Sequence, residues 1–368
     1  MLEKGKIGLR QFIVFVILFT IGSSILVAPS GLAQEGKQDG WMAEILALAL
    51  GLLLVWLYNT LGKRFPNLTL AEYCQEILGK WPGRAVALLF LSYYFVLASL
   101  LLREIGDFLT TQIMPETPIQ AVHVIFLIIV IMGARLGLEP LVRAGEIFLP
   151  WVIFLFLVMV VFISPQIKFD NMQPLLGEGF KPVLRAAFPA LGLPYMELCV
   201  FLMIFPYINR PEKIGKAFGI GTIIAGVMLI IVVLLSILVI GADLTALQIY
   251  PSYVIVKKIS IGHFLERIEA VMAGIWFLTI YFKLTLCFYA VALGLAQILK
   301  LKDYRCLTFP LGMIAMAFSI VGSPNIIYFN TFVAKIWTPY SLTFGLVLPL
   351  VLLAVNTWNR KRAKKMNQ

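Results

Sequence analysis

The chain has 368 residues, of which 61% are hydrophobic and 13% are charged, and its formal net charge is +11. Soluble domains contain about 45–50% apolar and about 25% charged residues. Surface-to-volume scaling prevents a soluble fold of this size from burying such an excess. The composition therefore predicts an integral membrane protein. It argues against a soluble enzyme, a nucleic-acid binder and a secreted disulfide scaffold.

Ten apolar stretches are long enough to cross a bilayer, whose core takes about 20 apolar residues per helix. In chain order they are residues 10–32, 41–61, 84–113, 118–136, 145–163, 183–207, 214–241, 266–299, 304–321 and 336–356. Residues 62–83 and 243–265 predict shorter interfacial helices. The sequence thus predicts an all-α membrane protein with ten transmembrane helices.

The positive charge of the chain is distributed unevenly along this predicted topology. Of the 30 Lys and Arg residues, twenty fall on one side, six on the other and four within spans. An excess of Lys and Arg marks cytoplasmic loops. We therefore expect both termini in the cytoplasm and a basic cytoplasmic tail at 357–368, which either contacts anionic lipid or is simply solvated.

Ten spans divide into five plus five, and an odd number of spans makes the second half enter the membrane in the opposite orientation. This is the condition for an inverted-topology repeat. We expect a single transmembrane domain over residues 1–368, with one repeat at about 10–163 and the other at about 183–356.

The first helix of each half is interrupted by residues that weaken helical hydrogen bonding. Backbone freed at membrane depth is tolerated only where it faces protein or a wet cavity. Two breaks at matched positions favour a binding site over close packing through small residues. The break residues are Gly22, Ser23 and Ser24 in the first span and Gly192, Leu193 and Pro194 in the sixth.

Four further residues lie near the midpoints of their spans, at the depth of the breaks. Tyr93 and Leu97 share one face of the third span, and Lys283 and Cys287 share one face of the eighth. A half-helix N-terminus at this depth offers unpaired N–H groups and a partial positive charge. This combination predicts a midplane ligand site suited to a carboxylate, and hence to an amino acid.

Charged residues inside spans are functional hypotheses by default. Three roles are open for Lys283: contact with an anionic group of the ligand, replacement of a coupling cation, or a pair with Glu197. Arg103 and Asp107 are spaced for an i, i+4 pair, and together with Glu104 they also offer a proton route.

The sequence indicates no metal site and no cofactor. Its four cysteines are scattered without CxxC spacing, and its two histidines are far apart. We interpret the cysteines as free thiols. No nucleophile–base arrangement is apparent, so we do not expect an enzyme.

Seven stretches, running nearly end to end, carry a family resemblance through their order and spacing. They are GSSILVAP (22–29), KQDGWMAE (37–44), FPNLTLAEYCQEILGKWPG (65–83), LLREIGDFL followed by PETPIQ (101–120), ARLGLEPLVRAGEI (134–147), QPLLGEGFKP (173–182) and PSYVIVKKISIGHFLERIE (251–269). In these the chain resembles the B subunits of spore germinant receptors, within the amino acid–polyamine–organocation transporter superfamily. The resemblance implies a LeuT-like fold of ten helices with helices 1 and 6 unwound.

The resemblance also implies positions for the ligand pocket. The positions that match the family's pocket are Gly22, Tyr93, Leu97 and Pro194. Lys283 and Cys287 depart from it, because the family can place a hydroxyl and a phenol there, and an ammonium changes the charge of the pocket. The fifth span also lacks the lysine that some proton-coupled members of the superfamily use.

Our main hypothesis is a germinant-sensing subunit of the spore inner membrane, which binds a small solute, an amino acid, and signals by a shift between conformations. The resemblance implies a membrane A subunit and a lipoprotein C subunit as partners. The alternatives are a secondary amino acid transporter coupled to H⁺ or Na⁺, and a water or ion pathway opened by the ligand. Besides these partners we expect only the lipid bilayer, and no nucleic acid.

Overall fold

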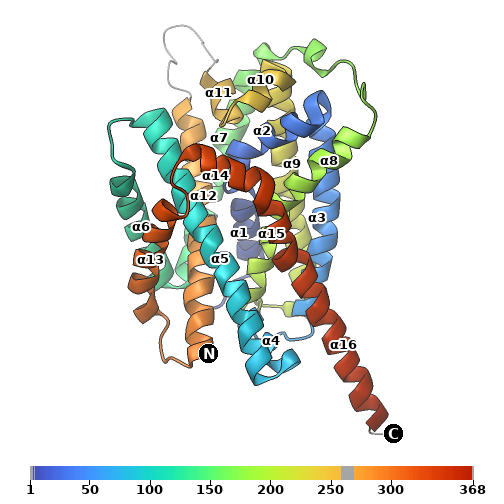
Figure 1. The fold of residues 1–368 in the computed structure, drawn as a ribbon, viewed down its shortest axis with the longest axis vertical. Helices are drawn as coiled ribbons and strands as arrows, with labels where there is room; N and C mark the ends of the chain where they lie inside the picture. The colour runs from blue at the N-terminus through green and yellow to red at the C-terminus, as the bar shows by residue number, and fades with distance from the viewer. Residues whose placement is uncertain (1–2, 4, 258–268, 367–368) are drawn as a thin grey trace.

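The computed structural model describes residue 3, residues 5–257 and residues 269–366. Within them, helix occupies each of the ten predicted spans (Figure 1). Eight helical segments are long and apolar enough to cross a membrane, and two shorter apolar helices cover Leu9–Ile21 and Arg305–Val321. The predicted all-α membrane fold is confirmed.

The first half of the chain forms the first five spans and one short amphipathic helix. Its helices are α1 (Leu9–Ile21), α2 (Ser24–Gly36), α3 (Gly40–Gly62), α4 (Leu70–Leu78), α5 (Lys80–Phe108), α6 (Ile119–Leu136) and α7 (Leu138–Ile163). A π-helical turn, η2 (Leu109–Ile113), extends α5.

The second half begins with the second interrupted span. This span consists of α8 (Lys181–Ala190), the π-helical turn η5 (Leu191–Tyr195) and the 3₁₀ helices η6 (Met196–Met203) and η7 (Phe205–Tyr207). It is followed by α9 (Ile214–Ile240), α10 (Ala242–Leu247), α11 (Pro251–Lys257), α12 (Glu269–Leu299) and α13 (Thr308–Val321). The last span contains α14 (Ile326–Phe332), η11 (Val333–Trp337), α15 (Thr338–Leu342), η12 (Thr343–Val347) and α16 (Leu348–Met366).

Two helices begin earlier than their apolar stretches. Helix α7 begins at Leu138 rather than at 145, and its polar first turns carry an ion pair between Arg143 and Glu139 at 2.5 Å. The last span begins at Ile326 rather than at 336, because the side chain of Asn325 accepts a hydrogen bond from the Tyr328 N–H and caps it. Polar first turns and caps lie outside what hydropathy detects.

The predicted outer interfacial segment forms α10 and α11, which are separated at Tyr250. Its remainder, residues 258–265, and the first residues of the predicted eighth span, 266–268, lie outside the described residues. The division into repeats at 10–163 and 183–356 stays a prediction.

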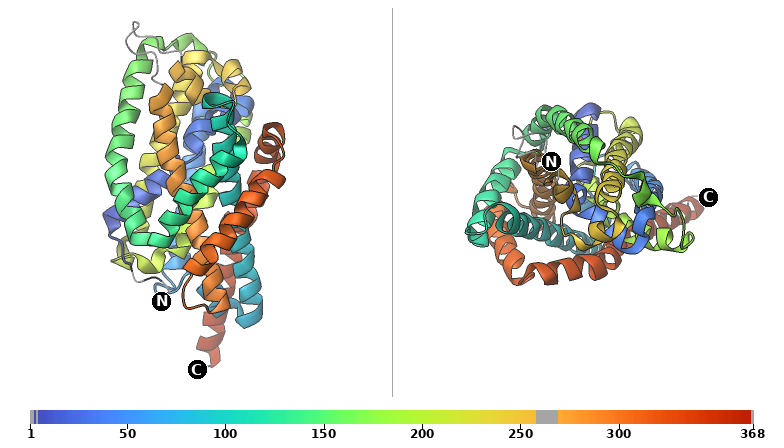
Figure 2. Two further views of the ribbon diagram at one scale, coloured as in Figure 1. Left: turned by 90° about the vertical axis from the view of Figure 1, so that its left-hand side faces the viewer. Right: turned by 90° about the horizontal axis from the view of Figure 1, so that it is seen from above.

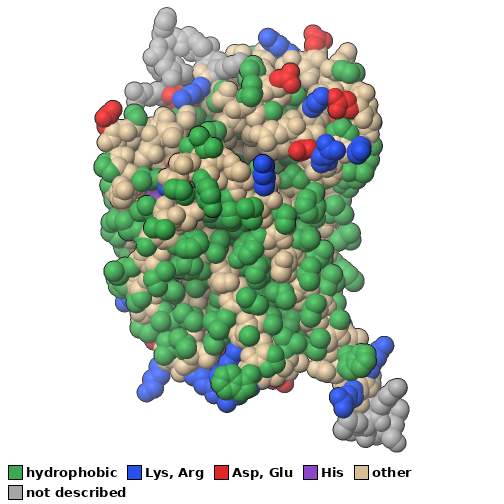
Figure 3. Space-filling view, viewed as in Figure 1, with side chains coloured by type: hydrophobic (Ala, Val, Ile, Leu, Met, Phe, Trp, Pro, Cys, Tyr) green, Lys and Arg blue, Asp and Glu red, His purple; other side chains and the backbone are tan. Residues whose placement is uncertain are grey.

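A wide apolar belt crosses the face of the molecule seen in Figure 3, and charged side chains gather above and below it. Helix α6 shows the pattern: Ile125, Ile128 and Met132 are 64%, 53% and 60% exposed, whereas Val130 and Ala134 on its other face are buried. An exposed apolar stripe at helical spacing is unfavourable in water and favourable against lipid. The belt is therefore the lipid-facing surface of a multi-pass membrane protein.

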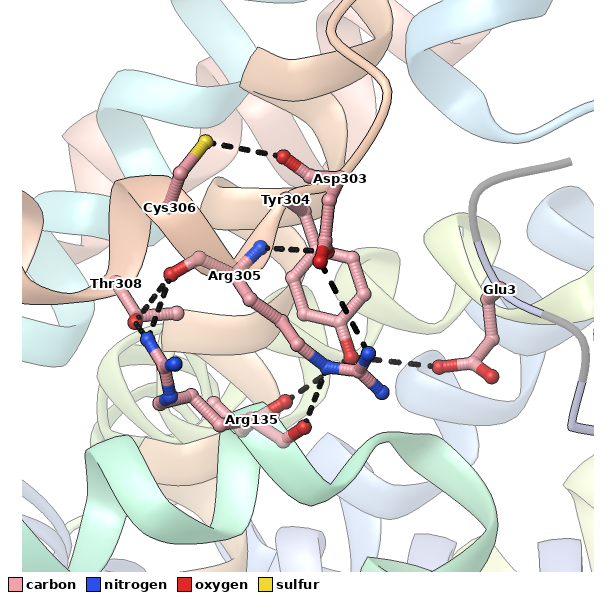
Figure 4. A network of polar contacts seen from close by, with 8 residues as sticks. Glu3, Arg135, Asp303, Tyr304, Arg305, Cys306 and Thr308 are labelled. Carbon is pink, nitrogen blue, oxygen red and sulfur yellow. Dashed lines mark hydrogen bonds and ion pairs between the residues drawn. The ribbon is translucent and has the colours of Figure 1, made fainter.

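Both termini lie at the same end of the bundle, and α16 extends beyond it there (Figures 1 and 2). At this end a polar network holds the N-terminal segment against the link between α12 and α13 (Figure 4). The Tyr304 hydroxyl donates to Glu3 at 3.5 Å and to the carbonyl of Ala134 at 3.1 Å. Arg305 donates to the carbonyl of Arg135 at 2.8 Å. Burial and the nearby Glu3 carboxylate raise the pKa of Tyr304 to about 12, so its hydroxyl stays a donor throughout the physiological pH range.

Candidate functional site

Both predicted helix breaks are present. Between α1 and α2, Gly22 has φ +24° and ψ −119°, which is outside helical geometry. A Cβ at Gly22 would collide with the side chain of Lys283 and lie 2.6 Å from the carbonyl oxygen of Phe19, so only glycine fits there. In the second break, Leu193 is extended, with φ −131° and ψ 109°. Helices 1 and 6 are therefore unwound, as predicted.

Lys283 of α12 connects the two breaks. Its Nζ lies 2.6 Å from Glu197 Oε2 on η6 and donates to Ser23 Oγ at 3.0 Å. The other carboxylate oxygen of Glu197 accepts from Trp337 Nε1 at 2.9 Å. The side chains of Lys283 and Glu197 are both 0% exposed. Of the three roles open for Lys283, the structure contains the pair with Glu197.

A cavity of about 220 Å³ extends from the two breaks to α2 and α10. These two helices lie at the end of the bundle away from the termini (Figure 1). For comparison, an engineered protein cavity of about 150 Å³ binds benzene, so the volume suits a small solute. Its inner part is lined by the two breaks, α5 and the last span, and its outer part by α2 and α10. Gln34 and Ile249 near its outer part are exposed to solvent.

The cavity includes some of the predicted site residues and not others. Those that line it are Ser23, Leu97, Glu104, Leu193 and Glu197. Those that lie outside its lining are Gly22, Ser24, Tyr93, Arg103, Asp107, Gly192, Pro194, Lys283 and Cys287. Gly22, Gly192 and Lys283 nevertheless shape it, because they set the course of the two breaks.

Tyr93 connects α5 to the last span. Its hydroxyl donates to Ser341 Oγ at 3.1 Å. Its ring stacks on Trp337 and Phe344, with centroid distances of 5.5 and 4.8 Å. Tyr93 was predicted to belong to the ligand site, but its phenol faces the last span and does not line the cavity.

The last span supplies cavity residues that the sequence reasoning missed. They are Phe329, Asn330, Val333, Ala334, Trp337 and Thr338. The interruption of its α-helical hydrogen bonding by the π-helical turn Val333–Trp337 coincides with this part of the wall. The one available signal was Trp337, an aromatic residue at the start of the predicted last span.

The opposite side of the breaks is closed. Ile7 donates its N–H to the carbonyl of Tyr207 at 2.9 Å and accepts from the Asn209 N–H at 2.9 Å. Above this contact, the Phe201 ring on η6 packs edge-on against Phe12 and Phe19 of α1, at centroid distances of 5.5 and 5.2 Å. The site is therefore reached from the end of the bundle away from the termini.

Among the described residues, no group of three or more His, Cys, Asp or Glu side chains is placed to hold a metal ion. The four cysteines are free. Cys287 is buried one turn from Lys283 on α12.

Comparison with known families identifies the chain's relatives. A family model described as "Spore germination protein" matches residues 6–327. The chain belongs to this spore germination protein family. Among the family's curated relatives, spore germination protein KB of Bacillus subtilis (strain 168) is 30% identical over 99% of this chain and 98% of its own. Spore germination protein YndE of the same organism is 26% identical over 98% of this chain and 99% of its own.

Solved structures extend the comparison to the fold of this spore germination family member. The structure of MhsT in complex with L-phenylalanine matches with a TM-score of 0.68 at 13% identity, covering 94% of this chain and 97% of that one. Mhp1, a nucleobase-cation-symport-1 family transporter, matches with a TM-score of 0.64 at 14% identity, covering 89% and 74%. At these identities the likeness concerns the fold alone, and it confirms the LeuT-like architecture.

Proposed function

We propose that this germinant-sensing membrane subunit binds its solute, an amino acid, in the cavity between the two broken helices. The observation that carries the proposal is that one solute-sized cavity touches both breaks, at Ser23 and at Leu193. A solute there contacts the two segments whose hydrogen bonding is already interrupted. It can therefore bias their conformation.

The N-terminus of α2 favours a carboxylate at the inner end of this cavity. Helix N-termini present unpaired N–H groups and a partial positive charge. Ser23, which directly precedes the first residue of α2, lines the cavity, so this N-terminus lies at the cavity wall. These donors support an anionic group as one end of the ligand.

The proposed mechanism is a shift between two conformations. The structure is closed at Ile7 and Phe201 and accessible from the other end, so a solute that prefers this form stabilises it. Converting a 1:99 population to 99:1 requires about a 10⁴-fold preference for one form. The signal would pass to a membrane A subunit and a lipoprotein C subunit in the spore inner membrane, with both termini cytoplasmic. The charge distribution and the family resemblance support this arrangement.

The proposal is tested with the full chain reconstituted alone in liposomes. Binding and uptake are measured separately with a panel of radiolabelled L-amino acids, with and without H⁺ or Na⁺ gradients. We expect saturable binding of at least one amino acid without gradient-driven accumulation. Accumulation that depends on a gradient would instead establish the chain as a secondary transporter.

A further inference from the structure

The ionisable side chains that line the cavity are both carboxylic acids. Among its described lining residues, the charged ones are Glu104 on α5 and Glu197 on η6, and no Lys or Arg is present. The two carboxylates differ in whether a cation compensates them.

Glu197 is compensated within the protein. Its Oε2 pairs with Lys283 Nζ at 2.6 Å and its Oε1 accepts from Trp337. Arg103, which adjoins Glu104 in the sequence, also has an ion-pair partner. Arg103 contacts both oxygens of Asp107, at 2.8 and 2.9 Å, and this fork geometry satisfies both partners. Among the described residues, neither cation forms an ion pair with Glu104.

In the part of the chain that the structure describes, Glu104 forms no ion pair within 4 Å. The residue is 5% exposed, and its Oε1 is buried without a hydrogen bond. A buried carboxylate is expensive unless it is paired and hydrogen-bonded. Because Glu104 faces a cavity rather than packed side chains, the missing partner can come from the cavity's occupant.

Aromatic rings accompany this carboxylate. Trp337 and Phe329 line the same cavity, and the face of an aromatic ring attracts a cation. A carboxylate without an ion pair, together with aromatic walls, is a favourable environment for an organic cation.

We propose that Glu104 is the subsite for a cationic group of the solute, an ammonium or guanidinium. The inference rests on the proposed function, because it takes the cavity as the solute site. It narrows the solute class to amines and amino acids whose positive group lies at Glu104, while the N-terminus of α2 accepts any carboxylate. Uncharged sugars and plain carboxylic acids fall outside this class.

The test uses the full chain in phosphatidylcholine nanodiscs and measures dissociation constants by calorimetry. The probes are L-alanine, L-valine, L-leucine and L-phenylalanine, the amine and the 2-hydroxy acid that match each, and D-glucose. We expect amino acids and amines to bind at least about tenfold more tightly than the matched hydroxy acids. Glu104→Gln keeps the shape of the side chain and removes its charge. It should weaken the binding of amino acids and of amines by at least about tenfold.

Glu44→Gln is the matched control. Glu44 is equally buried, but it accepts a hydrogen bond from Tyr195 and does not line the cavity. This variant should keep every dissociation constant within about twofold.

If Glu104→Gln does not fold, the proposal is tested by whether the unmodified chain binds amines more tightly than the matched hydroxy acids. If hydroxy acids or glucose bind as tightly as the amines, the cationic subsite is overturned. The proposal that the cavity binds a solute would still stand. Failure of every probe to bind would instead count against the proposed function itself.

Discussion

The buried pair of Lys283 and Glu197 predicts a large stability effect that a second mutation reverses. Lys283→Met removes the ammonium and keeps much of the side-chain volume. It leaves Glu197, which is 0% exposed, with Trp337 as its remaining hydrogen-bond donor. It also removes the donor to Ser23 Oγ at 3.0 Å. Removing one partner of a buried pair costs about 3–5 kcal/mol, so we expect a loss near 4 kcal/mol.

Part of the lost stability should return when the unpaired carboxylate of Glu197 is also removed. Glu197→Gln retains an amide oxygen that can accept from Trp337 Nε1 and eliminates the uncompensated carboxylate. The double variant should therefore be about 2 kcal/mol more stable than Lys283→Met alone, because replacing both partners of a buried pair with neutral groups is much less costly than removing one.

The assay is thermal unfolding of the purified chain in detergent, followed by tryptophan fluorescence, for both single variants, the double variant and the unmodified chain. Lys335→Met is the matched control, because Lys335 is exposed on the last span. Exposed substitutions usually change stability by less than about 0.5 kcal/mol. A cost below about 1 kcal/mol for Lys283→Met, or a double variant no more stable than it, would refute the view that this pair holds the two breaks together.

Two other predictions concern residues beside the cavity. Gly22→Leu should reduce the germination response of spores at least tenfold while the subunit still accumulates, because a side chain there collides with Lys283; a normal rate of dipicolinic acid release would contradict this. Tyr93→Phe should cost about 1 kcal/mol of stability, because the hydroxyl bond to Ser341 is lost. It should leave solute affinity within about twofold, and a tenfold change in the dissociation constant would show that the phenol reaches the solute.

Much of the fold could be predicted because each helix that crosses a bilayer needs about 20 consecutive apolar residues. Apolar length located the spans, and Gly22 and Pro194 located the breaks, since glycine and proline act on their own backbone. The starts of α7 and of the last span were missed because they depend on a polar first turn and on the cap at Asn325. Hydropathy carries no information about either.

The site was predicted less completely because residues on one helix face can meet different neighbours. Leu97 and Tyr93 lie one turn apart on the same face of α5, yet Leu97 lines the cavity and Tyr93 packs on the last span. The contribution of Trp337 depends on which helices are neighbours, and this is a property of the assembled bundle. The single sequence likewise left open whether Lys283 pairs with Glu197.

If a germinant acts in this cavity, filling the cavity with a larger side chain should abolish the germination response of spores. Leu97→Phe adds volume at a lining residue that is 2% exposed. Leu89→Phe makes the same change on the outer face of α5, where Leu89 is 50% exposed. Dipicolinic acid release is measured in spores carrying either variant, with subunit levels checked by immunoblot. We expect a loss of at least about tenfold in germinant sensitivity for Leu97→Phe and a normal response for Leu89→Phe. An unchanged response in Leu97→Phe spores would contradict it.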